Sequence, residues 1–148
     1  MSESAASAAK NRPEFRNINA FKDLPSSRLP VAGIVSILHR IGGVIIFLLV
    51  PFIVWMFDTS ISSEISFAKF TSTFNVGMLG LPGILWKLIA LGLIWAYLHH
   101  LIAGFRHLWM DTHHAAVSKE FGQSSAVFTL AVSVGLTVVL GAKLFGLY

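Results

Sequence analysis

Ionisable side chains with helical spacing stand within one of the apolar runs of this chain. The sequence from Tyr97 to Asp111 reads YLHHLIAGFRHLWMD. A helix turns about 100° per residue, so an arc of about 80° holds Tyr97, His100, Gly104, His107 and Asp111. Ionisable groups inside a membrane helix are costly and usually functional. This face of the helix is therefore expected to carry the chemistry.

His100 is the sharpest candidate for cofactor binding. A neutral imidazole is a good axial ligand for haem iron, and Gly104, on the same face, leaves room for a flat macrocycle. His107 lies about 10 Å of helix rise further on, so His100 sits within the hydrocarbon region if His107 marks its boundary. The alternative is a histidine bonded to a neighbouring helix, with Gly104 as a packing contact. His99, about 100° around the helix, is the rival ligand.

A second polar cluster, SILHRIGG, occupies residues 36–43. Ser36 and Arg40 are four residues apart, so a hydroxyl and a guanidinium share one helix face with Gly43. These two donors suit a carbonyl or carboxylate, such as a quinone oxygen or a haem propionate. The alternative is an arginine that reaches the lipid headgroups.

Asp111 allows three interpretations. Its carboxylate could pair with Arg40 or Arg106, or it could relay protons from water. The remaining interpretation is a solvated carboxylate at a helix end. In the last apolar run, Ala131-x-x-x-Gly135 and Gly141-Ala142 predict close helix packing.

Composition and hydropathy predict the elements that position these residues. The 148 residues are 55% hydrophobic and 12% charged, which is typical of a membrane protein. A polar arm of residues 1–30 precedes three apolar spans at about 31–57, 81–110 and 124–147, with a polar connector at 58–77. Pro51 predicts a kink in the first span. We therefore expect an all-α fold, with three transmembrane helices in a domain of residues 31–148.

The distribution of lysine and arginine predicts the orientation. The arm, Arg40, Arg106 and Lys119 fall on one side. The other side has only Lys69, Lys87 and Lys143. The amino terminus is therefore expected inside, as a cytoplasmic arm, and the carboxy terminus outside.

Composition also excludes several classes of function. The chain has no cysteine, which excludes disulfides, thiolate zinc sites and cysteine-ligated iron–sulfur clusters. Nucleic-acid binding is not expected, because no basic patch is interleaved with aromatic residues. Three helices enclose little core, so partner subunits are expected.

Three motifs together resemble a known family. They are RP at 12–13, SILHRxxG at 36–43, and HxxxGxRHxxxD at 100–111. They resemble the cytochrome b subunit of succinate dehydrogenase, and the likeness extends over about residues 12–147, including loop order. The last span matches only as a hydrophobic helix.

The resemblance implies one of two membrane anchors of respiratory complex II. In that family a flavoprotein subunit oxidises succinate to fumarate, and an iron–sulfur subunit passes the electrons to ubiquinone. The chain would have no activity alone, because it has no flavin or iron–sulfur motif. Its implied partners are those two subunits, the second anchor and membrane lipid.

The resemblance also assigns roles to particular residues. It implies that His100 ligates haem b opposite a histidine of the second anchor, with His39 beside the haem propionates and Arg40 touching haem and quinone. It implies quinone binding by Ser36, Ile37 and Arg40, and a role for Asp111 in the quinone or proton-delivery region. The register of the motif favours His100 over its neighbour His99.

Several alternatives remain open from the sequence. One is the anchor of a fumarate reductase that runs the reaction in reverse. Another is a proton-coupled transporter subunit that uses His100, Arg40 and Asp111 as a relay, and a further one is a purely structural anchor. The expected location is the inner membrane of a bacterial cell, because the arm is short, with the mitochondrial inner membrane as the alternative.

Overall fold

The computed structural model describes residues 19, 21–23, 27–113 and 117–148. Its long helices are α3 (Val31–Ile61), α5 (Gly83–Thr112) and α6 (Lys119–Leu144). Between α3 and α5 lie the short helix α4 (Glu64–Asn75) and an antiparallel pair of strands, β1 (Gly77–Met78) and β2 (Leu81–Pro82). Each long helix is long and apolar enough to cross a membrane. The prediction of an all-α, three-span anchor fold is therefore confirmed.

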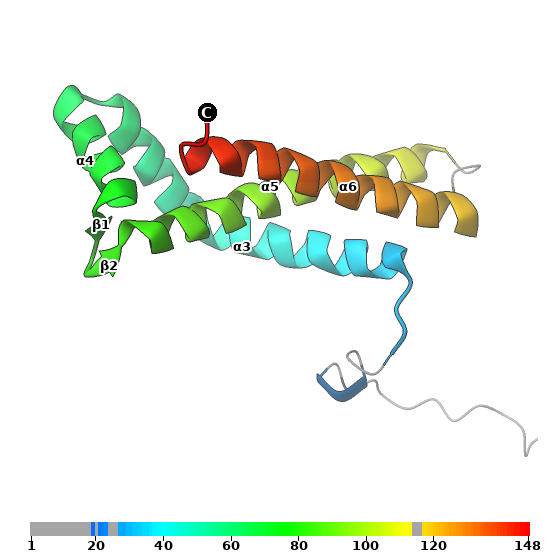
Figure 1. The fold of residues 1–148 in the computed structure, drawn as a ribbon. Helices are drawn as coiled ribbons and strands as arrows, with labels where there is room; N and C mark the ends of the chain where they lie inside the picture. Colours follow the sequence, from blue (N-terminus) through cyan, green and yellow to red (C-terminus); the bar gives the residue numbers. More distant parts are fainter. Residues whose placement is uncertain (1–18, 20, 24–26, 114–116) are drawn as a thin grey trace, which may run out of the picture.

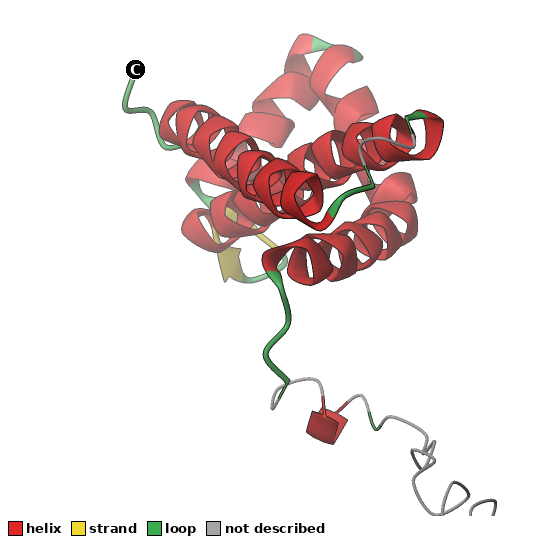
Figure 2. Ribbon diagram, turned by 90° about the vertical axis from the view of Figure 1, so that its right-hand side faces the viewer, coloured by secondary structure: helices red, strands yellow, loops and turns green. Residues whose placement is uncertain are grey.

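The three long helices lie side by side, and each runs antiparallel to the one before it (Figure 1). The start of α3, the end of α5 and the start of α6 therefore share one end of the bundle, called here the near end. The opposite, far end carries α4 and the two strands. Figure 2 shows that, apart from these two strands, the secondary structure of the described residues is helical. Most of the arm expected at 1–30, including the RP pair, lies outside the described residues.

The connector expected at 58–77 contains a helix that its polar composition conceals. Helix α4 begins after Ser63, whose hydroxyl accepts from the backbone N–H of Ser66, while the Ser66 hydroxyl accepts from the backbone N–H of Ser63. This reciprocal capping box satisfies two backbone donors at the helix start. The usual signature has Glu or Gln at the third position, so serine gives a weaker sequence signal.

Pro51 lies inside α3, as expected for the first span. Proline removes one backbone hydrogen bond and its ring crowds the preceding turn, which favours a kink. Figure 1 shows α3 changing direction along its length, toward α4.

The buried centre of the bundle is made of small and polar residues. Its apolar members are Val35, Ala96, Ala103 and Ala126, and its polar members are His99, Thr129 and Ser133. Small side chains let helix backbones approach closely, which is how membrane helices gain packing energy. Most large hydrophobic side chains face outward instead, including Phe47, which is 77% exposed.

Gly42 makes the closest approach between α3 and α5. A β-carbon added there would lie 3.3 Å from the backbone oxygen of Ala96. This contact belongs to the α3–α5 interface, which also brings the polar residues of the two helices together. The packing at Gly42 therefore controls the distance between the polar residues of α3 and those of α5.

We expect Gly42→Leu to separate the two helices and to lower the free energy of unfolding by about 1–3 kcal/mol. Thermal unfolding of the detergent-purified protein measures this. Gly135→Leu is the matched control, because Gly135 is exposed on α6 with open space around it. Equal midpoints for the two variants would contradict the proposed close contact.

Candidate functional site

His100 is held by a backbone carbonyl of the neighbouring helix. Its Nδ1 lies 3.0 Å from the carbonyl oxygen of His39 on α3. A carbonyl oxygen only accepts, so the hydrogen of a neutral ring sits on Nδ1 and Nε2 keeps its lone pair. The described residues contain no buried side-chain nitrogen or oxygen without a partner. Nε2 of His100 makes no hydrogen bond within them, so it lies at the surface of the chain, open to a ligand.

The His100 ring adjoins the His39 ring, which in turn adjoins the His107 ring. The His39 ring stacks on that of His100 with a centroid distance of 4.2 Å and an interplanar angle of 5°. The His107 ring lies 5.1 Å from that of His39, tilted by 52°. These three residues, called here the imidazole cluster, bring the SILHR segment of α3 against the histidine face of α5.

Glycines on both helices make room for the cluster. A β-carbon at Gly43 would lie 2.7 Å from Cε1 of His100, so only glycine leaves the ring its space. At Gly104 the nearest atom to an added β-carbon is Nε2 of His39, at 3.6 Å, which is ordinary contact. The His39 side chain therefore lies over this face of α5 at ordinary contact distance, and the approach of a flat group at Gly104 stays a prediction.

His99, the rival ligand, is locked inside the bundle. It is only 1% exposed. Its Nδ1 lies 3.4 Å from Oγ of Ser133 on α6, and its Nε2 lies 3.3 Å from the carbonyl oxygen of Val35 on α3. Both ring nitrogens are engaged, so neither is available to a ligand. His99 instead joins all three long helices.

Ser36 and Arg40 carry hydrogen-bond donors that nothing in the described chain uses. Ser36 is half-buried and Arg40 is exposed, and neither side chain has a hydrogen-bond partner among the described residues. Ile37, the third residue expected to bind the quinone, is also half-buried and follows Ser36 in the sequence. The donors stand within one turn of His39, beside the imidazole cluster.

Arg106 and Asp111 do not form the pair that the sequence allowed. Nε of Arg106 donates to Oγ of Ser125 at 2.9 Å, and Nη2 donates to the carbonyl oxygen of Gly122 at 3.0 Å. Arg106 thus ties α5 to the start of α6. Asp111 is exposed and makes no ion pair with Arg40 or Arg106 within the described residues. Within this part of the chain it is a carboxylate open to water at the near end.

The face of α6 that meets α5 was missed from the sequence. The bonded residues Gly122, Ser125 and Ser133 recur with helical spacing, and this small polar stripe is the signal that identifies the face. The predicted packing pair, Ala131 and Gly135, is exposed instead. Gly141 does pack closely, because a β-carbon there would lie 2.7 Å from Cδ1 of Leu91.

The described residues offer individual imidazole ligands rather than a complete metal site. No group of three histidine or acidic side chains close enough to hold a metal ion occurs among the described residues. An open imidazole without further protein donors suits a metal whose other positions are already filled by a macrocycle. The residues present therefore fit a haem.

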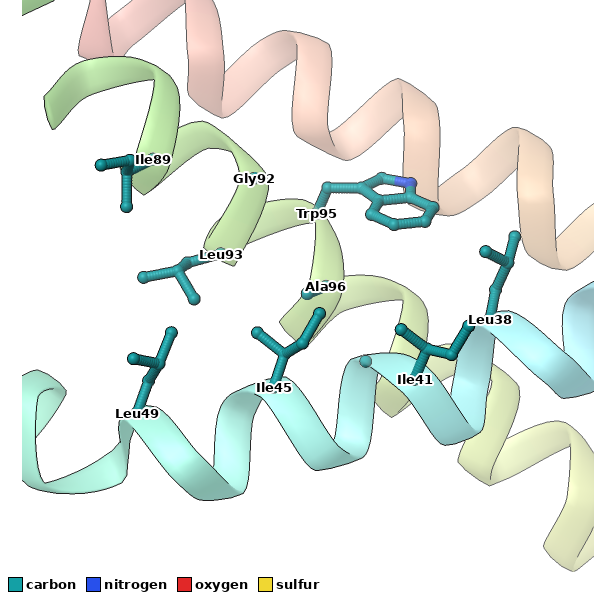
Figure 3. Close-up of a pocket in the computed structure, with 10 residues that line it drawn as sticks. Leu38, Ile41, Ile45, Leu49, Ile89, Gly92, Leu93, Trp95 and Ala96 are labelled. Atoms are coloured by element: carbon teal, nitrogen blue, oxygen red, sulfur yellow. The ribbon is translucent and has the colours of Figure 1, made fainter. Parts of the chain in front are cut away.

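An apolar groove of about 370 Å³ also runs between α3 and α5 (Figure 3). It is lined by residues such as Leu38 and Ile45 of α3 and Leu93 and Trp95 of α5. Ile45 lies on the opposite side of α3 from Ser36, since a helix turns about 100° per residue. The groove has no titratable side chain, so it adds no chemistry to the imidazole cluster.

Comparison with known proteins identifies the family. The model of the succinate dehydrogenase/fumarate reductase transmembrane subunit family matches residues 9–140. This chain belongs to that family. It is 32% identical to the succinate dehydrogenase cytochrome b556 subunit of Paracoccus denitrificans over 129 residues, which cover 87% of this chain and 88% of that protein. The subunit of the same name from Coxiella burnetii is 33% identical over 119 residues, or 80% of this chain and 90% of that protein.

Membership confirms the resemblance carried by the motifs. The anchor subunit is a multi-pass membrane protein, as its three apolar helices also indicate. Its relatives are subunits of succinate dehydrogenase, an oxidoreductase complex. Membership favours an electron-transfer anchor over the proton-coupled transporter that the polar side chains alone allowed.

We expect His99→Ala to lower the free energy of unfolding by about 2–4 kcal/mol, because it removes a buried ring together with its hydrogen bonds to Ser133 and to the Val35 carbonyl. The midpoint of thermal unfolding in detergent measures the change. His113→Ala is the control, since His113 is exposed at the end of α5 and bonds only to its own turn. A midpoint for His99→Ala as high as that of the control would refute this tie between the helices.

Proposed function

We propose that this chain is the haem b- and ubiquinone-binding anchor of a succinate dehydrogenase. The observation that carries the proposal is the His100 ring, with Nδ1 on the His39 carbonyl and Nε2 open at the surface. The location proposed is the inner membrane of a bacterial cell, with the amino terminus inside. The bacterial relatives and the distribution of lysine and arginine support that location and orientation.

The proposed iron ligand is Nε2 of His100. Metal-ligating histidines commonly donate their other ring hydrogen to a carbonyl or carboxylate, which fixes the ring and makes the ligand more basic. The His39 carbonyl is in position to do this. The relatives carry the name cytochrome b556, which supports haem b as the group bound. Haem supplies a one-electron redox centre when it is bound.

The second axial ligand is proposed to come from the second anchor subunit. Nε2 of His100 makes no hydrogen bond within the described residues, and the adjacent His99 is engaged inside the bundle. A six-coordinate haem therefore needs an imidazole from a neighbouring chain. His39, stacked on His100, and exposed Arg40 are proposed to adjoin the haem propionates.

Ser36 and Arg40 are proposed to bind the quinone, with Ile37 contributing apolar contact. Succinate loses two electrons and two protons to become fumarate in the flavoprotein subunit. Ubiquinone gains two electrons through the iron–sulfur subunit and takes up two protons to become ubiquinol. Negative charge develops on the quinone oxygen during reduction, and a preorganised hydroxyl and guanidinium stabilise it. Both donors are free within the described chain to do so.

Asp111 is proposed to deliver protons from water at the near end. Its carboxylate is exposed one helical turn beyond His107, which adjoins His39 in the imidazole cluster. The carboxylate makes no ion pair within the described residues, so solvent reaches it directly. The physiological direction proposed is succinate oxidation, since both relatives are named for it.

The first test is optical. We expect His100→Ala to abolish the low-spin b-type difference spectrum, reduced minus oxidised, of the assembled complex, because the variant has no axial ligand on this side. The control is His113→Ala, which leaves the imidazole cluster intact. An unchanged spectrum in His100→Ala would remove His100 as the ligand.

The second test separates quinone reduction from succinate oxidation. Loss of one hydrogen bond to a charged group costs about 1.5–3 kcal/mol, so Ser36→Ala and Arg40→Ala are each expected to slow quinone reduction by roughly 10- to 150-fold. Dye-linked succinate oxidation should persist, because it does not need the anchor's donors.

Ser124→Ala is the matched control for the serine, because Ser124 is exposed and bonds only to carbonyls of its own helix. It should retain full quinone reduction. Wild-type quinone reduction in both Ser36→Ala and Arg40→Ala would contradict the proposed site.

A further inference from the structure

The depth of the far end follows from the length of α5. Trp86 and His107 are about 21 residues apart on this helix, or roughly 32 Å of helix rise. A hydrocarbon core is about 30 Å thick. With His107 at one boundary, Trp86 stands at the other. The strands β1 and β2, immediately before α5, therefore lie at the opposite membrane surface.

A hydrogen bond from Trp86 holds the β1–β2 hairpin at the same membrane depth as that residue. Nε1 of Trp86 donates to the carbonyl oxygen of Met78 in β1 at 3.1 Å. The ring of Phe52 on α3 lies 6.2 Å from that of Trp86, so α3 reaches the same boundary there. The hairpin is thus held at the membrane surface by a side chain of a spanning helix.

The turn of the hairpin holds a leucine in an unfavourable backbone conformation. Met78 pairs with Leu81, which leaves Leu79 and Gly80 as a two-residue loop. Their φ values are 55° and 75°. Positive φ at both positions is the pattern of a type I′ turn, which favours Asn-Gly. A left-handed conformation is unfavourable for a residue such as leucine, because its β-carbon crowds the following carbonyl oxygen.

The apolar side chain of Leu79 would also be unfavourably hydrated if its surroundings were water. Leu79 is 81% exposed. Val76, just before the hairpin, is a second exposed apolar side chain, at 79%. An open strand edge cannot lie in hydrocarbon, because its backbone groups would have no partners. The boundary between headgroups and acyl chains accommodates both the open backbone and the apolar tip.

The lysines at the far end suit a lipid surface. The exposed charged side chains at this end are of both signs, on Asp58, Glu64, Lys69 and Lys143. The ammonium of Lys87 lies 5.8 Å from the centroid of the Phe145 ring. Lysines at a membrane surface are attracted to anionic headgroups.

We propose that the β1–β2 hairpin is an interfacial anchor whose Leu79 inserts, with Val76, into the lipid leaflet at the far end. The occupant of this surface is lipid, and the insertion sets the depth of the α3–α5 pair in the membrane. The proposal depends on the spanning arrangement and not on haem or quinone binding.

The test measures the depth of position 79 in a bilayer. Because this chain has no cysteine, Leu79→Cys can carry a nitroxide label in the assembled complex. The complex is placed in nanodiscs of phosphatidylcholine and phosphatidylglycerol. Collision rates with oxygen, which concentrates in lipid, and with a water-soluble nickel chelate are then compared. Asn75→Cys, exposed on the polar end of α4, is the matched control.

We expect oxygen collisions to dominate at position 79 and nickel collisions to dominate at position 75, with a several-fold difference in their ratio. Equal nickel access at the two positions would place the tip in water and overturn the proposal. Protection of position 79 from both reagents would place a protein over the tip and overturn it equally.

A second variant separates insertion from folding. Leu79→Asn suits the turn, since asparagine is favoured at positive φ, and it removes the apolar tip. We expect a nitroxide at Val76→Cys to become several-fold more accessible to nickel when Leu79→Asn is added, with no loss of thermal stability. Unchanged access at position 76 would contradict insertion led by Leu79.

Discussion

One hydrogen bond organises the near end of this anchor, between Nδ1 of His100 and the carbonyl oxygen of His39. It decides which ring nitrogen carries the hydrogen and which keeps the lone pair. It also fixes the His100 ring against α3, where His39 stacks upon it and Gly43 leaves it room. The proposed ligand is therefore oriented by this chain before any other protein or cofactor takes part.

The neighbouring residues make that bond possible. Gly42 lets α3 and α5 approach closely, while His99 holds both helices and α6 through its two ring nitrogens. The adjacent residues His99 and His100 therefore differ in environment and in proposed role. His99 faces inward and joins helices, whereas His100 faces the surface and keeps one nitrogen open. This division follows from the helical turn of about 100° between consecutive residues.

Hydropathy and spacing predicted much of this structure. Apolar length predicted the three helices, and residues four apart predicted that Ser36 and Arg40 share a face. The sequence predicted the contacts between helices less well. The partner of Arg106 proved to be Ser125 and Gly122 rather than Asp111, because the rotation of α6 is set by tertiary packing. Helix α4 was hidden by a polar composition and a serine-only capping box.

Residue spacing alone also could not predict which of the two adjacent histidines has a ring nitrogen free for a ligand. Spacing leaves His99 and His100 as rivals, and the motif register favours His100. The structure adds a physical reason, since each nitrogen of His99 already has a partner on another helix. Ser36 and Arg40 are the proposed quinone donors, and the proposal leaves the rest of that pocket to other subunits.

A high-resolution map of the assembled, haem-loaded complex tests the central claim most directly. The expected result is iron within bonding distance of Nε2 of His100, with Nδ1 still on the His39 carbonyl. Iron bound through another histidine of this chain, or a His100 ring turned toward acyl chains without iron, would contradict the account.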